Sequence, residues 1–352
     1  MSLQETEREW PTVSIIIVNL NGRKWLKGLF ESVLASDYPE DKLEIVFVDN
    51  GSSDRSVDYV KIEFGSEPRL RIVALNKNYG FTMGNNIGSR YINKKARYIV
   101  FLNPDTQVDE HWLKELVRVM ESDLTVGMAQ SLLLDYYKRQ VVQCAGIYMI
   151  DFCGWTWALC RDLSYDHFVD HFPRPIEIFA AMGAAMIIRR DLFYEVGCFD
   201  PEFFMFSDEA DLAWRVWLMG YRVMLFPRSI VYHAIGGSNE DIGEFKNTFA
   251  ERHRNKNVIR MLIKNYDTKH LFLYLPIATT LMYTRAVYYV FMKKRVSPII
   301  GFIQAIIWNI LNLQSTLRQR RYIQGVVRKD TKNLKSIMGK RLPLSEIIIR
   351  MK

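Results

Sequence analysis

The chain has 352 residues, of which 49% are hydrophobic and 24% charged, and this composition excludes an intrinsically disordered protein. The length suits one α/β catalytic domain with a smaller appendage. Residues 1–251 carry 26 basic and 36 acidic side chains, whereas residues 252–352 carry 21 basic and 3 acidic ones. The acidic N-terminal part disfavours nucleic acid as a partner. The basic, apolar C-terminal part favours an anionic membrane surface.

The cysteines and the N-terminal residues indicate a compartment. Cys144, Cys153, Cys160 and Cys198 form no C-x-x-C pair and match no common zinc spacing, so we expect buried free thiols. Residues 1–10 are polar and acidic and do not resemble a signal peptide. Free thiols without a signal peptide are typical of the cytoplasm.

Strands alternate with helices over the first hundred residues. Short apolar runs predict buried strands at 13–18, 43–48, 70–75 and 98–102, and helices are expected at about 24–35, 56–64 and 83–92. This alternation predicts parallel β-α-β units, which bind ligands at the carboxyl ends of their strands. Each of the four strands ends in a polar cluster, so we expect a site there.

The pattern is weaker between residues 126 and 179 and becomes clear again afterwards. A buried strand is expected at 180–188, a turn at 197–201, a helix at about 208–219, and strands at 221–227 and 230–233. After about residue 252 the chain becomes basic and apolar. Its two charge-free runs, 271–284 and 298–313, are shorter than the roughly 20 residues that a spanning helix needs.

Four motifs carry a resemblance to a known family. They are V-S-I-I-I-V-N at 13–19, V-D-N-G-S-S-D at 48–54, N-K-N-Y-G-F at 76–81 and F-L-N-P-D at 101–105. In this order they resemble the family 2 (GT-A fold) glycosyltransferases, and their rhamnosyltransferase-like branch most closely. The resemblance spans about residues 12–237. It implies a GT-A-like α/β domain with a mainly parallel sheet at 12–252, after an N-terminal extension at 1–11. The tail lies outside the resemblance, and its basic, apolar composition predicts a helical membrane-associating region at 253–352.

The resemblance implies a set of donor-binding residues at the ends of the strands. Asp49 would contact the nucleoside, although an Asp-Asn-Gly-Ser-Ser sequence also makes a good turn in which this carboxylate is only a cap. The full set comprises Asn19, Asn21, Asp49, Asn50, Asn78, Gly80, Asn86 and Asn103.

Asn103-Pro104-Asp105 matches the position of the family's D-x-D motif, which binds a divalent metal, Mn²⁺ or Mg²⁺. Such a cation bridges the two phosphates of the donor and makes the nucleoside diphosphate a better leaving group. Because the first acidic position is Asn103, Asp105 is the sure carboxylate. His233 is the candidate for a further ligand. The alternatives are a proline-centred turn and a structural histidine.

Residues 206–212 resemble the family's E-D motif, which carries the catalytic base, but the order is reversed to Asp208-Glu209. Glu209 takes the base position, and Asp208 could serve instead. The structural alternative is that Ser207 caps a helix with acidic residues in its first turn. Asp211 lies four residues before Arg215 and could pair with it on one helix face.

The resemblance implies transfer of a single sugar from dTDP-rhamnose or a UDP-sugar, with inversion, to an acceptor hydroxyl. A lipid-linked saccharide is the expected acceptor, because the C-terminal part would place the active site against a bilayer. The Q-x-x-R-W signature of processive synthases is absent from the sequence. The expected location is the cytoplasmic face of a membrane, peripheral or monotopic, because the basic, aromatic C-terminal part suits the headgroup boundary. The alternatives are a catalytically inactive nucleotide-sugar-binding protein, a nucleotidyltransferase, and a soluble module whose C-terminal helical hairpin binds a partner or packs on the catalytic domain.

Overall fold

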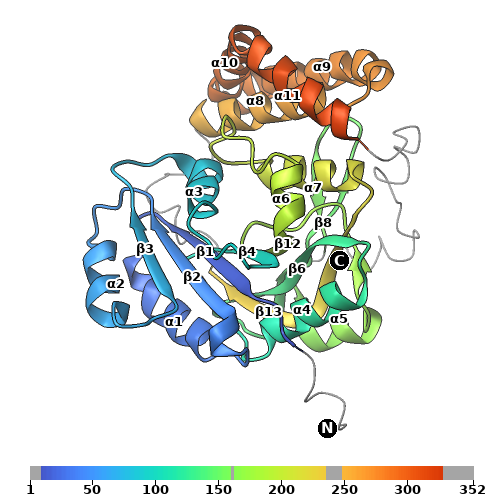
Figure 1. Cartoon of the computed structure of the whole chain (residues 1–352). Coiled ribbons are helices and arrows are strands. Elements are labelled where there is room, and N and C mark those ends of the chain that lie inside the picture. The colour runs from blue at the N-terminus through green and yellow to red at the C-terminus, as the bar shows by residue number, and fades with distance from the viewer. Residues whose placement is uncertain (1–8, 160–161, 235–247, 328–352) are drawn as a thin grey trace.

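The computed structural model describes residues 9–159, 162–234 and 248–327. The first half is built of β-α units, as expected. Its strands are β1 (Val13–Asn19), β2 (Leu43–Asp49), β3 (Leu70–Ala74) and β4 (Tyr98–Leu102). Its helices are α1 (Arg23–Leu34), the short η1 (Glu40–Lys42), α2 (Ser56–Phe64) and α3 (Gly80–Gly88). The four strands are parallel, in the order β4-β1-β2-β3, so their carboxyl ends share one edge of the sheet (Figure 1).

The continuous apolar runs of these strands are explained by burial on both faces of the sheet. Successive side chains of a strand point to opposite faces. Ile16 of β1 and Phe101 of β4 pack into one hydrophobic cluster, whereas Ile15 and Val100 pack into another on the other face. A strand buried on both faces has to be apolar at every position.

The second half of the chain completes the sheet and adds helices. Its strands are β5 (Thr106–Val108), β6 (Val126–Asp135), β7 (Val141–Cys144), β10 (Leu163–Ser164), β11 (Ile176–Glu177), β12 (Ala185–Arg189) and β13 (Arg222–His233), with β8 (Ile147–Ile150) and β9 (Thr156–Ala158) in a separate hairpin. The helices are α4 (Trp112–Ser122), α5 (Tyr165–His171), α6 (Arg190–Glu195) and α7 (Asp208–Leu218). Among the described residues the sheet has eleven strands, with the order β10-β7-β6-β12-β4-β1-β2-β3 on its main path.

This second half makes the sheet mixed. β12 lies between β4 and β6 and is antiparallel to both, whereas β13 is parallel to β6. The strand expected at 180–188 is shorter and shifted, because residues 181–184 form a turn before β12. The two strands expected at 221–227 and 230–233 are one long strand, β13, whose register with β6 shifts between Phe226 and Ile230.

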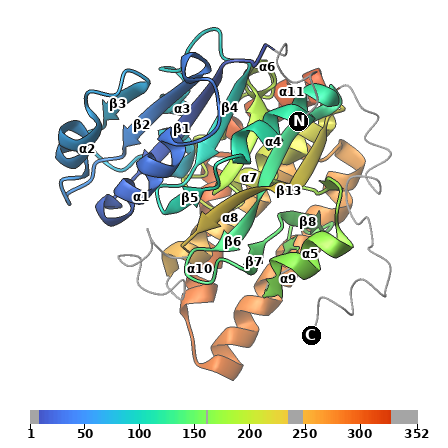
Figure 2. The ribbon, with the colours of Figure 1, turned by 90° about the horizontal axis from the view of Figure 1, so that it is seen from below.

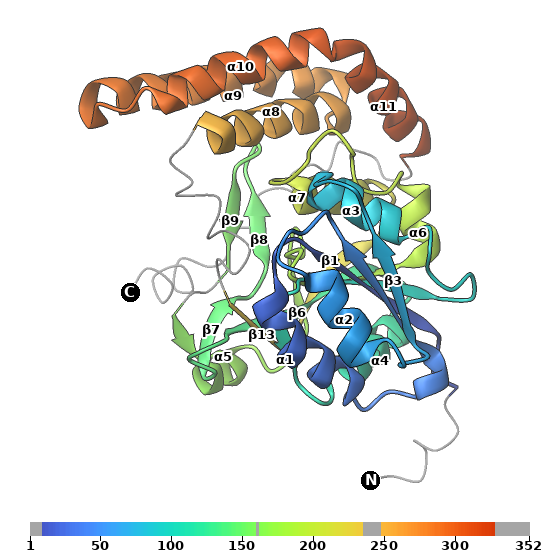
Figure 3. The ribbon, with the colours of Figure 1, turned by 90° about the vertical axis from the view of Figure 1, so that its left-hand side faces the viewer.

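Four further helices form a layer that covers one end of the molecule (Figures 1 and 3). They are α8 (Thr248–Asn265), α9 (Thr268–Lys293), α10 (Ser297–Leu311) and α11 (Leu313–Val326). Helices α3, α6 and α7 lie between this layer and the sheet. α9 and α10 form an antiparallel hairpin whose tip projects beyond the rest of the chain (Figures 2 and 3).

The helical layer shares a hydrophobic core with the sheet. Met261 and Leu262 of α8, Met282 of α9 and Ile323 of α11 are buried in the cluster that also contains Ile16 of β1. The boundary expected after residue 252 falls inside α8, so no linker separates the two parts there. Of the described helices, none is by itself long and apolar enough to cross a membrane. α10 and α11 together would qualify, but the chain bends by 69° between them.

The composition of the C-terminal part led us to expect its charge at the surface, but part of this charge is buried. Lys256, Arg260 and Lys264 repeat at four-residue intervals along α8, and each is at most 3% exposed. Burial in water-free surroundings is costly for a charge unless it finds partners, and these three side chains find theirs within the protein. They therefore cannot attract a membrane surface.

Candidate active site

The polar residues that the sequence singled out gather at the carboxyl edge of the parallel strands. Asn19 and Asp49 are register partners at the ends of β1 and β2, and the Asn19 amide nitrogen donates to Oδ1 of Asp49 at 3.0 Å. Both side chains are buried. Oδ1 of Asn19 has no hydrogen-bond partner among the described residues, so it is available to a polar ligand.

The turn after β2 uses the same residues as structural groups. Oδ2 of Asp49 accepts from the backbone nitrogen of Ser52 at 2.9 Å, which is the capping role that the sequence left open. Oδ1 of Asn21 accepts from the backbone nitrogen of Ser53 at 2.8 Å. Asp49 and Asn21 therefore build the turn, and their contact with a donor stays a prediction.

A second turn, before α3, is tied to the end of β2 by Asn50. Its amide nitrogen donates to Oδ1 of Asn78 and to the carbonyl of Gly80, both at 3.1 Å, and its Oδ1 accepts from the backbone nitrogen of Tyr79 at 2.9 Å. Gly80 has a φ of +82°, and a Cβ there would lie 2.5 Å from the ring of Phe204. Only glycine fits this position. The turn starts α3 at Gly80, three residues before the helix expected from the sequence.

Asn86, also expected to bind the donor, makes a long-range structural contact. Its amide nitrogen donates to the carbonyl of Phe199 at 2.8 Å, and its Oδ1 accepts from the backbone nitrogen of Phe199 at 3.1 Å. A donor would have to displace these two bonds to reach the amide. The donor role of Asn86 therefore stays a prediction that this geometry does not favour.

The two expected metal ligands face each other. Asp105 follows β4 and is 2% exposed, and His233 ends β13. Oδ1 of Asp105 lies 3.4 Å from Nε2 of His233 and has no hydrogen-bond partner among the described residues. β5 pairs with β13 so that Thr106, the neighbour of Asp105, is opposite His233. The sheet itself therefore sets this contact.

Gln143 on β7 determines the tautomer of His233, and with it whether the nitrogen that faces Asp105 is a donor or an acceptor. Its amide nitrogen donates to the backbone carbonyl of His233 at 2.6 Å, which points its amide oxygen, Oε1, at Nδ1 of the same histidine, also at 2.6 Å. Nδ1 must therefore carry the proton. In the neutral ring Nε2 then presents a lone pair to a carboxylate oxygen, which is unfavourable unless something positive lies between them.

A divalent cation fits this arrangement. A carboxylate oxygen and an imidazole nitrogen are both metal ligands, and a hydrogen bond from the other ring nitrogen is the usual support of a ligating histidine. No group of three or more His, Cys, Asp or Glu side chains arranged to hold a metal occurs among the residues that the structure describes. The described part of the protein thus offers two ligands at this point.

Asn103 and Glu209 are connected through two consecutive residues before β12. The backbone nitrogen of Asn103 donates to the carbonyl of Ala184 at 3.0 Å, and the backbone nitrogen of Gly183 donates to Oε1 of Glu209 at 3.4 Å. A Cβ on Gly183 would lie 3.3 Å from the same Oε1. The turn at 181–184 therefore brings the Asn103-Pro104-Asp105 segment close to the carboxylates that begin α7.

The two carboxylates of that pair have different surroundings. Asp208 is 3% exposed, and its Oδ2 has no hydrogen-bond partner in the described part of the chain, whereas Glu209 is half-buried. Burial, and then the charge of Glu209, raise the pKa of Asp208 well above its ordinary value. Burial also raises the pKa of Glu209. A partly accessible carboxylate of raised pKa has the properties of a general base.

The residues around this pair test two expectations from the sequence. Ser207 is the N-cap residue of α7, and acidic residues follow in the first turn, as the structural alternative expected. Its φ is 57° and its side chain makes no capping hydrogen bond, so that part of the alternative is wrong. The pairing of Asp211 with Arg215 is confirmed: Arg215 Nη2 lies 2.8 Å from Oδ2 of Asp211, and both side chains are buried.

Sequence reasoning missed several residues that support the site. Gln143 had no local pattern that would distinguish it. Lys256, Arg260 and Lys264 did have one, because three bases at four-residue intervals on one helix face are unusual without acidic neighbours. Asp200, the partner of Arg260 and Lys264, was interpreted only as part of a turn. Cys144, Cys153 and Cys198 are free thiols, as expected, but only Cys144 is buried; Cys153 and Cys198 are partly exposed, and Cys160 lies outside the described residues.

The fold agrees with comparisons to known proteins. The model of the family described as Glycosyl transferase family 2 matches residues 14–197, just over half of the chain. The chain therefore belongs to this family.

Individual relatives support the rhamnosyltransferase-like resemblance. The chain is 28% identical over 231 residues to O-antigen biosynthesis protein RfbC of Myxococcus xanthus, covering 64% of this chain and 17% of that protein. It is 26% identical over 251 residues to rhamnosyltransferase WbbL of Escherichia coli strain K12, covering 66% of this chain and 86% of the relative. The chain spans 41% and 61% of the length of two other curated relatives.

Solved structures confirm the GT-A-like fold. The structure of GalNAc-T7 with UDP, GalNAc and Mn²⁺ superposes with a TM-score of 0.60 at 19% identity, covering 86% of this chain and 58% of that one. At this identity the likeness concerns the fold alone.

Proposed function

We propose that this chain transfers a single sugar from dTDP-rhamnose or a UDP-sugar to a hydroxyl group of a lipid-linked saccharide, with inversion at the anomeric carbon. One observation carries the proposal. A buried carboxylate oxygen of Asp105 without a hydrogen-bond partner among the described residues faces the acceptor nitrogen of His233. Such a pair is suited to one cation and, through it, to the diphosphate of a donor. The Mn²⁺ and UDP bound to GalNAc-T7 in its solved structure support the same interpretation of the site.

In this proposal Asp105 and His233 hold a divalent metal, Mn²⁺ or Mg²⁺, while Asn19, Asp49 and Asn103 line the donor side. A bound cation would neutralise the charge that develops on the departing nucleoside diphosphate. The remaining chemistry belongs to the chain. Glu209 accepts the proton of the acceptor hydroxyl while the hydroxyl oxygen attacks the anomeric carbon. The bond from that carbon to the diphosphate breaks on the opposite side.

We assign the base to Glu209 and not to Asp208. Asp208 is too buried for an acceptor hydroxyl to reach it directly. Its raised pKa keeps its proton on, which spares the site a second negative charge beside the base. Glu209 is partly accessible, and its contact with the backbone nitrogen of Gly183 orients it toward the segment that carries Asp105.

A panel of nucleotide sugars tests the donor assignment. We expect dTDP-rhamnose or one of the UDP-sugars to raise Tm with Mn²⁺ present and much less without it, because a ligand that binds only the folded state stabilises it. Glu209→Gln should keep this shift and lose transfer. A shift without any transfer or donor hydrolysis in the unaltered chain would identify an inactive binding protein. A response to nucleoside triphosphates instead would favour a nucleotidyltransferase.

We also propose that the helical layer attaches the chain to the cytoplasmic face of a membrane. Helices α9 and α10, with Val296 between them, carry large apolar side chains that are 40–77% exposed, and we call this set the apolar face. They are Phe272, Leu273, Ile277, Leu281, Tyr283, Tyr288, Phe291, Met292, Val296, Ile300, Ile303, Ile307, Ile310 and Leu311. A surface of this kind marks an interaction site.

Charge favours a lipid surface as the occupant of the apolar face. Residues 268–326 contain eight basic residues and no acidic residue. Lys293, Lys294 and Arg295 are exposed at the projecting tip of the α9–α10 hairpin, next to Phe291 (Figure 3). Apolar side chains bordered by basic ones suit the boundary of an anionic bilayer. A lipid-linked acceptor would be met at the same surface.

Sedimentation with phosphatidylglycerol vesicles tests the attachment in the full chain. Phe272→Gln with Phe291→Gln removes two rings that are 76% and 77% exposed, and we expect it to weaken binding at least tenfold. Ile62→Gln is the matched control, because Ile62 is 79% exposed on α2, away from this face. Equal binding by all three proteins, or no binding of the unaltered chain at low salt, would contradict the proposal.

A further inference from the structure

The segment that leads into the candidate base has an unusual backbone. Phe204, Phe206 and Ser207 have φ angles of 66°, 73° and 57°, in the left-handed region that disfavours side chains other than glycine. Asp208 and Glu209 follow directly. A backbone of this kind persists only where its surroundings hold it. The position of the two carboxylates therefore depends on the contacts of residues 203–207, which we call the base loop.

Asn257 on α8 holds the base loop through hydrogen bonds. Its amide nitrogen donates to the carbonyls of Phe203 at 3.1 Å, Met205 at 2.8 Å and Phe206 at 2.8 Å. Asn257 is fully buried. A single side chain thus provides hydrogen bonds to three of the five carbonyls of a loop more than 50 residues away in the sequence.

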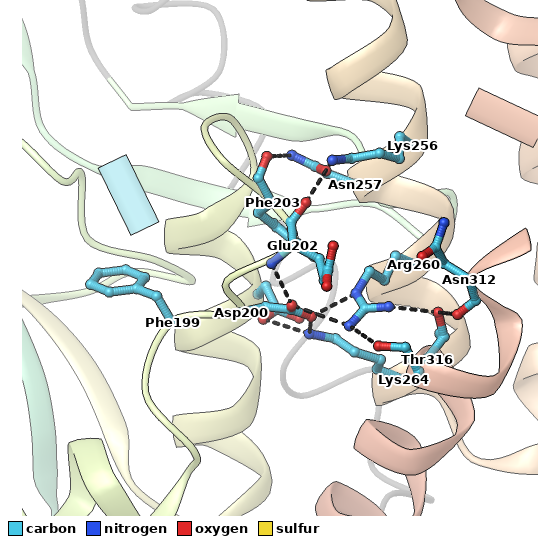
Figure 4. Close-up of polar contacts among 12 residues, drawn as sticks. Phe199, Asp200, Glu202, Phe203, Lys256, Asn257, Arg260, Lys264, Asn312 and Thr316 are labelled. Carbon is cyan, nitrogen blue, oxygen red and sulfur yellow. Dashed lines mark hydrogen bonds and ion pairs between the residues drawn. The ribbon is translucent and has the colours of Figure 1, made fainter. Parts of the chain in front are cut away.

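Lys256, the neighbour of Asn257 on α8, holds the residue just before the base loop. Lys256 Nζ donates to the carbonyl of Glu202 at 2.6 Å (Figure 4). On the opposite side the base loop touches α3, because the backbone nitrogen of Thr82 donates to the carbonyl of Phe204 at 3.4 Å. Gly80 packs against Phe204 at the same point. The base loop therefore lies between α8 and the turn that carries Gly80.

Buried ion pairs fasten α8 to both ends of the segment. Asp200, just before the base loop, accepts from Arg260 at 2.8 Å and from Lys264 (Figure 4). Lys264 also donates to Asp211 of α7 at 3.0 Å, and Asn265 donates to the other oxygen of Asp211 at 3.0 Å. These contacts fix α8 against the helix that begins with Asp208 and Glu209.

The outer side of α8 is covered by the helices that carry the apolar face. Gly301 of α10 allows close contact, since a Cβ there would lie 2.7 Å from Cβ of Glu251. Arg285 of α9 pairs with Glu251 at 3.0 Å, and Asn309 of α10 donates to the carbonyl of Lys256 at 3.1 Å. The helical layer thus supports the base loop from outside.

We propose that Asn257 is a positioning residue for the Asp208–Glu209 pair, and that α8 is part of the catalytic apparatus as well as of the membrane-attached layer. The proposal rests on the function proposed above, in which Glu209 is the base. Asn257 itself touches neither donor nor acceptor in this scheme. Its loss would let the base loop relax toward ordinary φ angles and would move Glu209 relative to the anomeric carbon. Displacements of about 1 Å cost roughly a hundredfold in rate.

The test compares Asn257→Ala with Asn309→Ala in the full chain. Both asparagines are buried and both donate to backbone carbonyls, but Asn309 contacts α8 and its own helix instead of the base loop. We expect Asn257→Ala to lower kcat at least tenfold and to leave the calorimetric affinity for the donor within about twofold. Asn309→Ala should lower Tm without this loss. Turnover is measured as nucleoside diphosphate released from dTDP-rhamnose, or from the UDP-sugar that stabilises the protein.

Hydrogen exchange supplies a readout that does not depend on activity. Peptides covering residues 203–211 should exchange faster in Asn257→Ala than in Asn309→Ala, and Asn257→Ser serves if the alanine variant does not fold. Unchanged exchange and kcat in the Asn257 variants would overturn the positioning role, as would an equal loss of kcat in Asn309→Ala. If Glu209→Gln keeps full turnover, the proposed base is wrong, and the exchange result alone decides whether Asn257 holds the base loop.

Discussion

Replacing Asp200 by asparagine should destabilise this protein more than almost any other single polar substitution. The side chain of Asp200 is 2% exposed and lies between Arg260 and Lys264, whose side chains are each 1% exposed. The asparagine side chain would keep the shape of the residue and remove the negative charge. Arg260 would then be left with the hydroxyls of Thr316 and Ser315, while Lys264 would retain Asp211.

The magnitude follows from this geometry. Removing one partner of a buried ion pair costs about 3–5 kcal/mol, because the remaining charge stays buried without compensation. Since Lys264 keeps one carboxylate, the lower part of that range applies, and we expect about 3 kcal/mol. This is a large share of the roughly 5–15 kcal/mol by which folded proteins are stable. For a chain of this length it should lower Tm by roughly 4 °C.

The effect of Asp200→Asn should be independent of pH between 5 and 8. Burial alone would raise the pKa of Asp200, but Lys264 and Arg260 outweigh it and hold the pKa well below its usual range. A carboxyl whose pKa is depressed on folding stabilises the protein fully above its unfolded pKa of about 3.9 and loses that contribution only as the pH falls further. The unaltered protein should therefore lose this stabilisation in acid.

Urea denaturation at pH 5, 6.5 and 8 measures the change. Glu31→Gln is the control, because it removes an exposed i,i+4 pair with Lys27 at 3.9 Å, which should contribute no more than about 0.5 kcal/mol. A loss below 1 kcal/mol for Asp200→Asn, similar to that of the control, would refute the reasoning. So would a loss that grows or shrinks strongly between pH 5 and 8.

Three further predictions concern the candidate site. Asp208→Asn should stabilise the protein at pH 8 and have little effect near pH 4. Burial and the charge of Glu209 raise the pKa of Asp208, so the folded protein binds a proton that the unfolded chain releases. This lowers the free energy of unfolding only as the pH rises above the unfolded pKa of the carboxyl group. Equal denaturation midpoints of the variant and the unaltered chain at pH 8 would contradict this. Asp105→Ala should abolish the Mn²⁺-dependent rise in Tm with the fold intact, and an unchanged rise would remove Asp105 from the metal site. Asp49→Ala should weaken donor affinity several-fold by calorimetry, through a lost hydrogen bond to the ligand. An unchanged affinity would leave Asp49 only its structural bonds to Asn19 and Ser52.

Much of the N-terminal half could be predicted from the sequence, because there the information is local. The apolar runs at residues 13–18 and 98–102 had to be buried on both faces, and the polar residues after them had to share one edge of a parallel sheet. Asp211 and Arg215 lie four residues apart on one helix, so their pairing followed from helix geometry alone. The motifs at these positions were enough to identify the fold.

The candidate site was predicted only in part, since several of its residues have partners far away in the sequence. Asn86 was expected to bind the sugar donor, but its side-chain amide forms hydrogen bonds with the backbone of Phe199, 113 residues later in the chain. The strand expected at residues 180–188 begins at Ala185, because the preceding residues bend toward Asn103 and Glu209. No periodicity within a short window contains information of this kind.

The charged residues of α8 show most clearly the difference between what the sequence predicts and what the tertiary structure decides. By composition, Lys256, Arg260 and Lys264 belonged to a basic tail directed at a membrane. The tertiary structure buries Arg260 and Lys264 against Asp200 and Asp211, at sequence separations of 53 to 64 residues, and Lys256 against the backbone carbonyl of Glu202. A charged side chain can be buried only where an opposite charge or a hydrogen-bond partner meets it, and which groups meet is decided by packing. The sequence by itself determined the four parallel strands, their motif-bearing edge and the apolar character of α9 and α10. The tertiary structure decided which of the polar residues are occupied in holding the fold and which remain available to a ligand.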